Sequence, residues 1–202
     1  MTLVEEILVK QLGRVDYLPT FEAMRVFTAR RDEATADEIW LLEHPPVYTL
    51  GQGAEWPSVD HGIPVVQADR GGEITYHGPG QVVLYALVDL ARRGIKVKQF
   101  VAMLENSVIE LLAGRGERKP GAPGVYVGGA KIAALGIRVS RGRAYHGLAL
   151  NVDMDLAPFA AIDPCGYPGL AVAQTRDLGI MKSMDEIGAE LATSLVGKLE
   201  HA

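Results

Sequence analysis

The segment from Gln81 to Leu90, QVVLYALVDL, constrains the fold of this chain more than any other. It is apolar enough to form a buried strand. A pair of strands is indicated further along the chain, where Lys131 to Ser140 and Arg143 to Val152 flank a Ser-Arg-Gly-Arg turn that is typical of a β-hairpin. Shorter strand candidates are Leu3 to Lys10, Glu38 to Glu43, Val47 to Leu50 (expected to extend the sheet of the preceding candidate), Pro64 to Gln67, Ile74 to Tyr76 and Gly124 to Val127.

Three segments have the spacing of apolar residues that predicts helices. Tyr17 to Arg31 is the first, and Ser183 to Glu186 is a capping box that opens a last helix running to about Leu199. Between them, Gln99 to Leu112 is amphipathic, with an expected inner face of Phe100, Met103, Leu104, Val108, Leu111 and Leu112. Strands outnumber helices and join mainly as hairpins. The pattern predicts an α+β fold of mixed, mostly antiparallel sheets with flanking helices, rather than a doubly wound sheet.

Length and composition favour one domain spanning residues 1–202. The chain has 48% hydrophobic residues and no visible linker, so one sizeable core is the expectation. The N-terminus has no basic region followed by an apolar run, as a signal peptide would, and no stretch approaches the roughly 18 apolar residues of a membrane span. We therefore expect a cytoplasmic protein that does not bind membranes.

The charge distribution excludes one class of partner and suggests another. A formal net charge of −5 argues against nucleic acid as the main partner. Basic residues nevertheless concentrate in the middle of the chain, which would suit docking of an acidic carrier protein, although any one of these clusters is more simply a solvated surface. The concentration comprises Arg92, Arg93, Lys96, Lys98, Arg115, Arg118, Lys119, Arg138, Arg141 and Arg143.

The chain has a single cysteine, Cys165, between prolines and glycines in Asp163 to Leu170, DPCGYPGL. One cysteine forms neither an internal disulfide nor a thiolate zinc site. Taken alone, the thiol is either a buried apolar filler, which is common for free cysteine, or a nucleophile. Its neighbours must decide between the two.

Two glycine-containing motifs are candidates for a binding site. Arg70 to Gln81, RGGEITYHGPGQ, places two glycines where the backbone must approach a ligand closely or make a tight turn. It lacks the spacing of a phosphate loop or a dinucleotide-binding fingerprint. In the second motif, Gly128 to Gly136, Lys131 opens an apolar strand as either an edge charge or a functional amine. Beside a thiol, such an ammonium would favour the thiolate.

Other polar residues support no separate site. Gly147 to Asn151, GLALN, ends a strand with small residues that could form one wall of a narrow acyl channel. His77 and His146 could converge in space, but their spacing matches no zinc motif. Asp153 and Asp155 lie in a loop-like stretch in which turn capping explains them as well as acid and base roles do.

Together, in this order, these motifs resemble the lipoyl(octanoyl) transferase family. The resemblance covers about His44 to Leu178. Each motif is weak alone, but the ordered set is specific. The matching pieces are RGGxxTYHGPGQ at 70–81, GAKIA at 129–133, HGLALN at 146–151 and PCG at 164–166 with Gly169 and Leu170.

The resemblance implies the fold of biotin and lipoate protein ligases, with no cofactor and no metal. It also implies transfer of an octanoyl group from acyl carrier protein to a lysine of lipoyl domains, those of 2-oxoacid dehydrogenase E2 subunits and glycine cleavage H protein. A monomer is the default expectation. Cys165 would be the acyl-bearing nucleophile, and Lys131 would favour its thiolate and handle protons. The implied acyl site comprises Arg70, Gly71, Gly72, Glu73, Ile74, Thr75, Tyr76, His77, Ala134, Leu135, Gly136, Gly147, Leu148 and Ala149.

Three alternatives remain open at this stage. An ATP-dependent lipoate or biotin protein ligase would share the fold but needs no cysteine nucleophile. A non-catalytic acyl-binding protein would keep the Arg70 to Gln81 loop without turnover. A cysteine hydrolase would use His77 or His146 as its base and release free octanoate.

Overall fold

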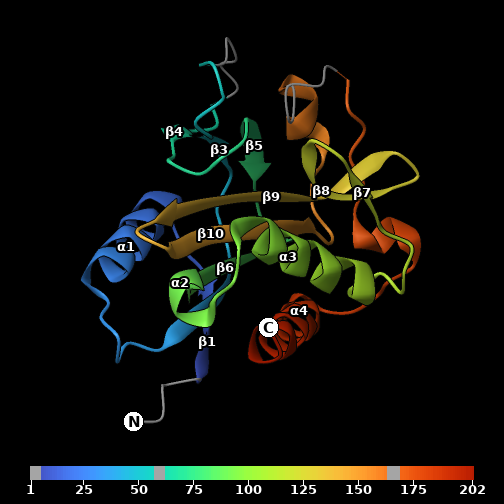
Figure 1. The fold of residues 1–202 in the computed structure, drawn as a ribbon. Coiled ribbons are helices and arrows are strands. Elements are labelled where there is room, and N and C mark those ends of the chain that lie inside the picture. The colour runs from blue at the N-terminus through green and yellow to red at the C-terminus, as the bar shows by residue number, and fades with distance from the viewer. Residues whose placement is uncertain (1–5, 57–61, 163–168) are drawn as a thin grey trace.

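The computed structural model describes residues 6–56, 62–162 and 169–202. Within them the chain forms a seven-stranded sheet of order β1-β2-β6-β10-β9-β8-β7 and a three-stranded sheet of order β4-β3-β5 (Figure 1). The larger sheet contains β1 (Ile7–Arg14), β2 (Asp37–Glu43), β6 (Gln81–Asp89), β7 (Glu117–Lys119), β8 (Ala122–Val127), β9 (Ala130–Ser140) and β10 (Arg143–Asn151). The smaller sheet contains β3 (Val47–Leu50), β4 (Val65–Gln67) and β5 (Ile74–His77).

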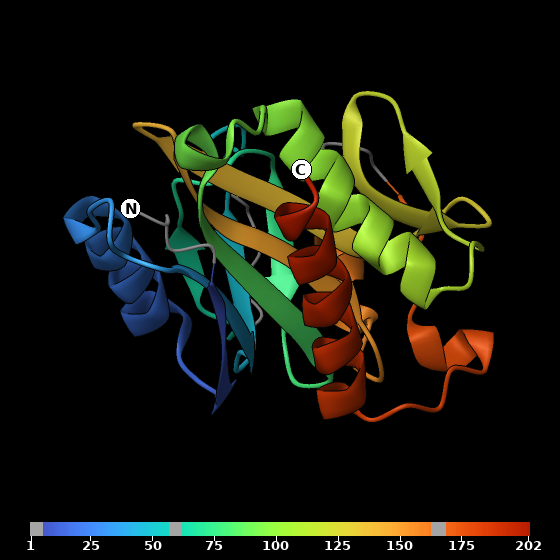
Figure 2. The ribbon, with the colours of Figure 1, turned by 60° about the horizontal axis from the view of Figure 1, so that its bottom comes forward.

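Helices cover both faces of the larger sheet. The long helices α3 (Val97–Leu111) and α4 (Met184–Glu200) lie side by side on one face, as Figure 2 shows, and the main apolar core is formed there. Helix α1 (Tyr17–Arg30) packs on the other face. Strand β6 is buried at every position because both faces of the sheet are covered.

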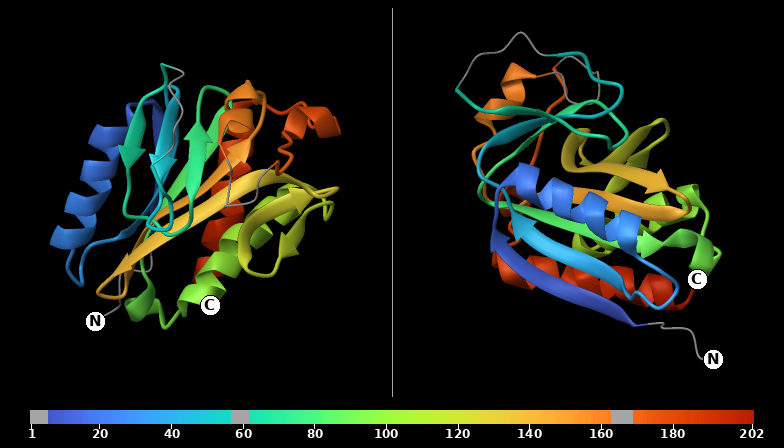
Figure 3. Two further views of the ribbon diagram at one scale, coloured as in Figure 1. Left: turned by 90° about the horizontal axis from the view of Figure 1, so that it is seen from above. Right: turned by 90° about the vertical axis from the view of Figure 1, so that its left-hand side faces the viewer.

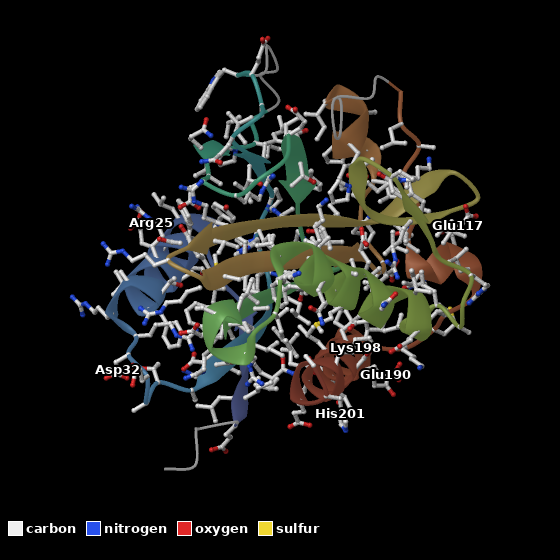
Figure 4. All side chains as sticks on the ribbon, in the orientation of Figure 1. Arg25, Asp32, Glu117, Glu190, Lys198 and His201 are labelled. Atoms are coloured by element: carbon white, nitrogen blue, oxygen red, sulfur yellow. The ribbon has the colours of Figure 1, made fainter. Side chains whose placement is uncertain are left out.

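Alternation along β2 explains how one strand serves both cores. Ile39 and Leu41 belong to the core below α3 and α4, whereas Trp40 and Leu42 contact the cluster below α1. Successive side chains of a strand point to opposite faces, so α1 and α4 lie on opposite sides of β2, as the right-hand view of Figure 3 shows. Charged side chains such as Arg25 and Glu190 lie on the outside of this arrangement (Figure 4).

The predicted α+β class and most predicted elements are confirmed. All strand pairs are antiparallel except β1 with β2 and β3 with β4. The capping box is present, with the Ser183 hydroxyl accepting from the Glu186 N–H and the Glu186 carboxylate accepting from the Ser183 N–H. Among the described residues, no helix combines the length and apolar character needed to cross a membrane.

Some predicted boundaries and assignments were wrong. Val47 to Leu50 does not extend the sheet of β2; the chain turns at His44-Pro45-Pro46 and β3 joins the smaller sheet. The first strand is Ile7–Arg14 rather than Leu3 to Lys10, and residues 3–5 lie outside the described residues. Within α3, Met103 and Leu111 are only half-buried.

Four short elements had no strong sequence pattern. These are the helix α2 (Leu90–Arg93), the 3-10 helices η1 (Ala157–Ala161) and η3 (Thr175–Leu178), and the edge strand β7. Asp89 caps α2 by accepting from the Arg92 N–H.

Candidate active site

A cavity of about 350 Å³ lies between the two sheets, and its walls are mainly apolar. Its floor crosses four neighbouring strands of the larger sheet, β6, β10, β9 and β8. Neighbouring strands lie about 4.8 Å apart, so three spacings give a length of roughly 14 Å. Tyr17 and Tyr85 lie at the β6 side, and Ala122, Pro123 and Lys131 lie at the β8 side. The cavity is therefore elongated, with different residues at its two ends.

Small residues let the backbone come close at the cavity floor. A Cβ atom on Gly147 would lie 2.1 Å from the carbonyl oxygen of Leu84 on the neighbouring strand. Such a contact is far inside van der Waals distance, so only glycine fits there. The loop after β4 crosses over β9 in turn, with the Gly71 N–H donating to the Ile137 carbonyl at 3.0 Å.

Arg70 shapes this loop from within. Its buried guanidinium donates to the Thr49 carbonyl at 2.7 Å, to the Thr49 hydroxyl at 2.8 Å and to the Glu73 carbonyl at 2.9 Å. A planar fork of donors is well suited to hold several carbonyls at once. The arginine thus fixes the cavity wall formed by Gly71 to Thr75 as well as lining it.

Lys131 lies at the β8 end of the cavity and is only 4% exposed. Its Nζ donates to the Pro123 carbonyl at 3.0 Å and lies 5.5 Å from the ring centroid of Tyr126. Its backbone N–H donates to the Ala171 carbonyl at 2.8 Å, and its carbonyl accepts from Ala173 at 3.0 Å. The segment 171–173 is therefore held directly beside the lysine.

Histidines and tyrosines gather at the opposite end of the cavity. His44 Nδ1 lies 2.7 Å from the Val15 carbonyl, which only a protonated Nδ1 can bond, so Nε2 accepts from the Tyr85 hydroxyl at 2.7 Å. Burial lowers the pKa of His44 to about 4. Burial, with the neighbouring His44, lowers the pKa of His77 to about 3. Both rings are neutral at pH 7.

A chain of hydrogen bonds joins the two ends. His77 Nδ1 pairs with the Gln81 side-chain oxygen at 2.7 Å, and the Gln81 amide donates to the Asn151 side-chain oxygen at 2.9 Å. The Asn151 amide donates to the Ala173 carbonyl at 3.0 Å. Ala173 in turn donates to Lys131, so motif residues far apart in the sequence form one connected network.

His146 has a different partner. Its Nε2 lies 2.8 Å from a carboxylate oxygen of Asp69, whose other oxygen accepts from the Tyr145 hydroxyl. Burial lowers the pKa of His146 although Asp69 opposes the change. His146 has a φ of 63°, which is unusual for a residue other than glycine and marks a strained point in the backbone of β10.

Tyr17 is the exception among these polar groups. Its hydroxyl is buried and, among the described residues, has no hydrogen-bond partner. Its ring stacks on that of His77, with centroids 6.0 Å apart, and burial raises the pKa of the phenol. An orphaned buried hydroxyl in a cavity wall is a group that a bound molecule or water can satisfy.

The structure brings nearly all the predicted site residues together. Lys131 and the predicted acyl-site residues line this cavity, with the exception of Tyr76. The Tyr76 ring packs instead against the rings of Tyr48 and Phe159, with ring centroids 5.5 Å apart in each case. Cys165 lies outside the described residues.

Several wall residues were not predicted as site residues. Tyr85 had one available signal, a polar tip within an otherwise apolar strand. Tyr17 had none, because its place depends on how α1 packs over β6. His146 and Asn151 also line the cavity, the first weighed from the sequence only as an alternative base and the second as the end of a channel wall. The additional wall residues are Tyr17, Val83, Tyr85, Val101, Gly121, Ala122, Pro123, Ile132, Ala133, Ile137, Phe159 and Val172.

The acidic and basic residues weighed from the sequence have structural partners. Asp155 accepts from the Ala157 N–H at 2.9 Å, as expected for turn capping, and Asp153 pairs with Arg176. Arg92 and Arg93 pair with the buried carboxylate of Asp37, at 2.8 and 2.6 Å, so they belong to the interior rather than to a docking surface. The described residues contain no group of three or more His, Cys, Asp or Glu able to hold a metal ion.

Comparison with known proteins gives consistent results. Residues 16–195 match the model of the lipoyl protein ligase A/B catalytic domain. An octanoyltransferase of Dechloromonas aromatica (strain RCB) is 59% identical over 197 residues, which cover 95% of this chain and 96% of that protein.

Two solved structures share the fold at low sequence identity. A bi-partite lipoate protein ligase from Thermoplasma acidophilum has a TM-score of 0.74 and 17% identity, covering 96% of this chain and 84% of that one. A biotin protein ligase from Aquifex aeolicus has a TM-score of 0.59 and 11% identity, covering 95% and 70%. The fold predicted from the sequence is therefore confirmed.

Proposed function

The chain belongs to the lipoyl protein ligase A/B catalytic domain family and is an acyltransferase, and on that premise we propose the reaction it catalyses. It transfers an octanoyl group from acyl carrier protein to a lysine of a lipoyl domain, through a thioester on Cys165. This is the first step in the endogenous synthesis of protein-bound lipoate. We further propose that residues 1–202 act as one catalytic domain, as a monomer in the cytoplasm, and without a cofactor.

The observation that carries the proposal is a buried lysine at one end of an elongated apolar cavity. Lys131 is 4% exposed, and the floor beside it is formed by small and apolar residues of β9 and β10. Each methylene of an acyl chain that enters such a cavity gains about 0.8 kcal/mol. The cavity suits a medium-length acyl chain whose reactive carbonyl lies near the lysine.

The proposed reaction has two steps. The Cys165 thiolate attacks the carbonyl carbon of the octanoyl thioester, a new carbon–sulfur bond forms, the carbon–sulfur bond to the carrier breaks, and the carrier leaves as its thiol. Lys131 stabilises the cysteine thiolate and supplies a proton to the departing sulfur. The amine of the acceptor lysine then attacks the acyl-enzyme, Lys131 accepts the proton that this amine loses, and the Cys165 thiolate leaves.

The position of residues 171–173 supports a role for Cys165 beside Lys131. The Ala171 carbonyl accepts a hydrogen bond from the backbone N–H of Lys131, and Cys165 stands six positions before Ala171 in the sequence. Six residues span at most about 20 Å. The proposed nucleophile therefore lies within a short length of chain from the proposed acid–base residue.

The histidines favour this assignment over a hydrolase. A general base works best when its pKa lies near the working pH. Burial lowers the pKa of His77 to about 3, and the Gln81 side chain already occupies its Nδ1. Burial also lowers the pKa of His146, which is paired with Asp69. Neither histidine therefore suits the role of base that a hydrolase would need.

The acceptors we propose are the lipoyl domains of 2-oxoacid dehydrogenase E2 subunits and the glycine cleavage H protein. The Thermoplasma acidophilum ligase belongs to an archaeal lipoylation system that includes its E2 lipoyl domain. The fold shared with that ligase supports a similar acceptor here. The remaining surface arginines and lysines of the central segment are the proposed docking contacts for acyl carrier protein.

The test is the intact mass of the purified protein after mixing with octanoyl-acyl carrier protein, without ATP and without an acceptor. We expect a gain of one octanoyl group that hydroxylamine removes and that Cys165→Ala does not show. A Cys165→Ala protein with an unchanged circular dichroism spectrum ensures that the loss is chemical. Absence of the adduct, with acylation of a lipoyl domain only when ATP and free octanoate are supplied, would assign the chain to the ligases instead.

A further inference from the structure

One peptide unit beside the cavity is held at both of its polar ends. The carbonyl of Pro123 accepts from Lys131 Nζ at 3.0 Å. The N–H of the same peptide, that of Gly124, donates to the Glu105 carboxylate at 3.1 Å. The carbonyl and N–H of one peptide point in opposite directions, so fixing one fixes the other. Glu105 and Lys131 therefore act on opposite ends of a single rigid group.

Glu105 is an unusual side chain for its position. It lies on the inner side of α3 and is only 7% exposed, although carboxylates are rarely buried without partners. Its second oxygen lies 3.6 Å from Nε of Arg118, whose side chain is 44% exposed. A buried carboxylate that accepts a hydrogen bond from a backbone N–H fixes the orientation of that peptide.

Gly124 makes the arrangement sensitive to that hydrogen bond. Its φ is 141°, and a Cβ atom there would lie 2.6 Å from Cε of Lys131 and 3.1 Å from Nζ. The lysine side chain thus packs directly on the glycine. Glycine also tolerates more backbone conformations than other residues, so loss of the partner of its N–H leaves this peptide freer to rotate at the start of the β8–β9 pairing.

We propose that Glu105 is a positioning residue for Lys131, acting through the Pro123–Gly124 peptide. This inference rests on the proposed role of Lys131 in acyl transfer. Without the carboxylate, the Gly124 N–H is orphaned in the interior and the peptide rotates to find a partner. The Pro123 carbonyl then turns away from the ammonium, and Nζ leaves its place at the end of the cavity.

Replacement of Glu105 tests the inference. Glu105→Met keeps the volume but removes the acceptor, and we expect kcat for octanoyl transfer to fall at least about tenfold, as small misplacements of catalytic groups do. The KM for the octanoyl carrier should change less than about twofold, because the change is confined to the Pro123 and Lys131 end of the cavity and the apolar floor formed by β9 and β10 stays in place. Glu105→Gln retains an oxygen at the same distance and should recover most of kcat. Glu110→Gln is the matched control, since Glu110 is an exposed carboxylate of the same helix that pairs with Lys198.

A double variant separates this inference from the function beneath it. If Glu105 acts through Lys131, Glu105→Met should cause no further loss in a Lys131→Met background. Additive losses, or an equal loss in Glu105→Gln, would overturn the positioning role. If Lys131→Met alone leaves transfer unchanged, the proposed function of Lys131 fails instead.

A further pair covers the case in which Glu105→Met does not fold. Glu105→Asp keeps the charge but shortens the side chain, so it should lose more activity than Glu105→Gln does. The reverse order would contradict a role that depends on the hydrogen bond to Gly124.

Discussion

The two ends of the cavity bury polar groups in opposite ways. At the β8 end, Lys131 bonds a backbone carbonyl and lies over the Tyr126 ring. At the β6 end, His44 and His77 are locked by side-chain partners, and burial keeps them neutral. The first arrangement keeps an amine at the cavity wall, whereas the second keeps its imidazoles neutral. Burial alone therefore does not identify a reactive group; the partners of that group must also be considered.

The contrast predicts that substitutions at the two ends will have separate effects. Changes at the Lys131 end should alter the rate of transfer more than the free energy of unfolding. Changes at the histidine end should alter the free energy of unfolding and its pH dependence. The hydrogen-bonded chain from His77 through Gln81 and Asn151 to Ala173 is the route by which the two could become coupled.

The largest expected effect is that of Lys131→Met on catalysis. Loss of a general acid–base group typically lowers the rate by about 10²- to 10⁴-fold, and we expect kcat to fall within that range. The unfolding midpoint in urea should change little, because methionine fills the same volume. Lys182→Met is the control, because Lys182 is an exposed lysine that pairs with Glu190, lies outside the cavity wall and is not among the proposed docking contacts. A comparable loss in Lys182→Met would show that the effect does not depend on the position of Lys131.

The next effect is the pH dependence of stability at the histidine end. His44 has a folded-state pKa of about 4, below the ordinary value near 6.5, so only the unfolded chain takes up its proton as the pH falls from 6.5 towards 4. The contribution of neutral His44 to the free energy of unfolding is complete above pH 6.5. It decreases by about 1.4 kcal/mol for each pH unit below that value. Between pH 7.5 and 5.0, His44 should account for a loss of about 2 kcal/mol.

Urea unfolding at these two pH values measures this contribution. His44→Gln should lose about 2 kcal/mol less than the natural protein between pH 7.5 and 5.0. His201→Gln is the control, because His201 is exposed at the end of α4, where Figure 4 labels it. Equal pH dependence in His44→Gln and the natural protein would show that His44 can be protonated while folded.

The smallest effect concerns two neighbouring tyrosines. Tyr85→Phe leaves His44 Nε2 without its donor, and we expect a loss of about 1–3 kcal/mol in the free energy of unfolding. Tyr17→Phe removes a hydroxyl with no partner among the described residues, so its effect should lie within about 1 kcal/mol of zero. Thermal or urea unfolding of both variants provides the comparison. A loss for Tyr17→Phe as large as that for Tyr85→Phe would mean that an ordered water satisfies Tyr17.

The sequence predicted local structure and the glycine-rich walls well, and the reasons are physical. The Ser183 capping box and the Ser140–Arg143 turn depend on a few adjacent residues, so they can be recognised without the rest of the fold. The loop from Arg70 and the strand from Gly147 were predicted because close backbone approach requires glycine in a pattern.

The remainder depends on contacts between distant segments. Glu105 occupies a helical position like any other charged residue, and only its approach to Gly124 gives it a role. Val47 to Leu50 has the composition of a strand, but its sheet is decided by the turn at Pro45-Pro46 and by pairing with β5. Tyr17 enters the cavity wall because α1 packs over β6, which no local pattern indicates.

The backbone pairing of Lys131 with Ala171 and Ala173 also has a consequence for local concentration. Cys165 stands six positions before Ala171, and a chain of that length spans at most about 20 Å. Groups tethered over so short a distance meet at effective concentrations in the millimolar range or above. On the proposed roles of these two residues, the thiol and the amine meet independently of protein concentration, and a single residue inserted between Cys165 and Ala171 would lengthen that tether while leaving the pairing of Lys131 in place.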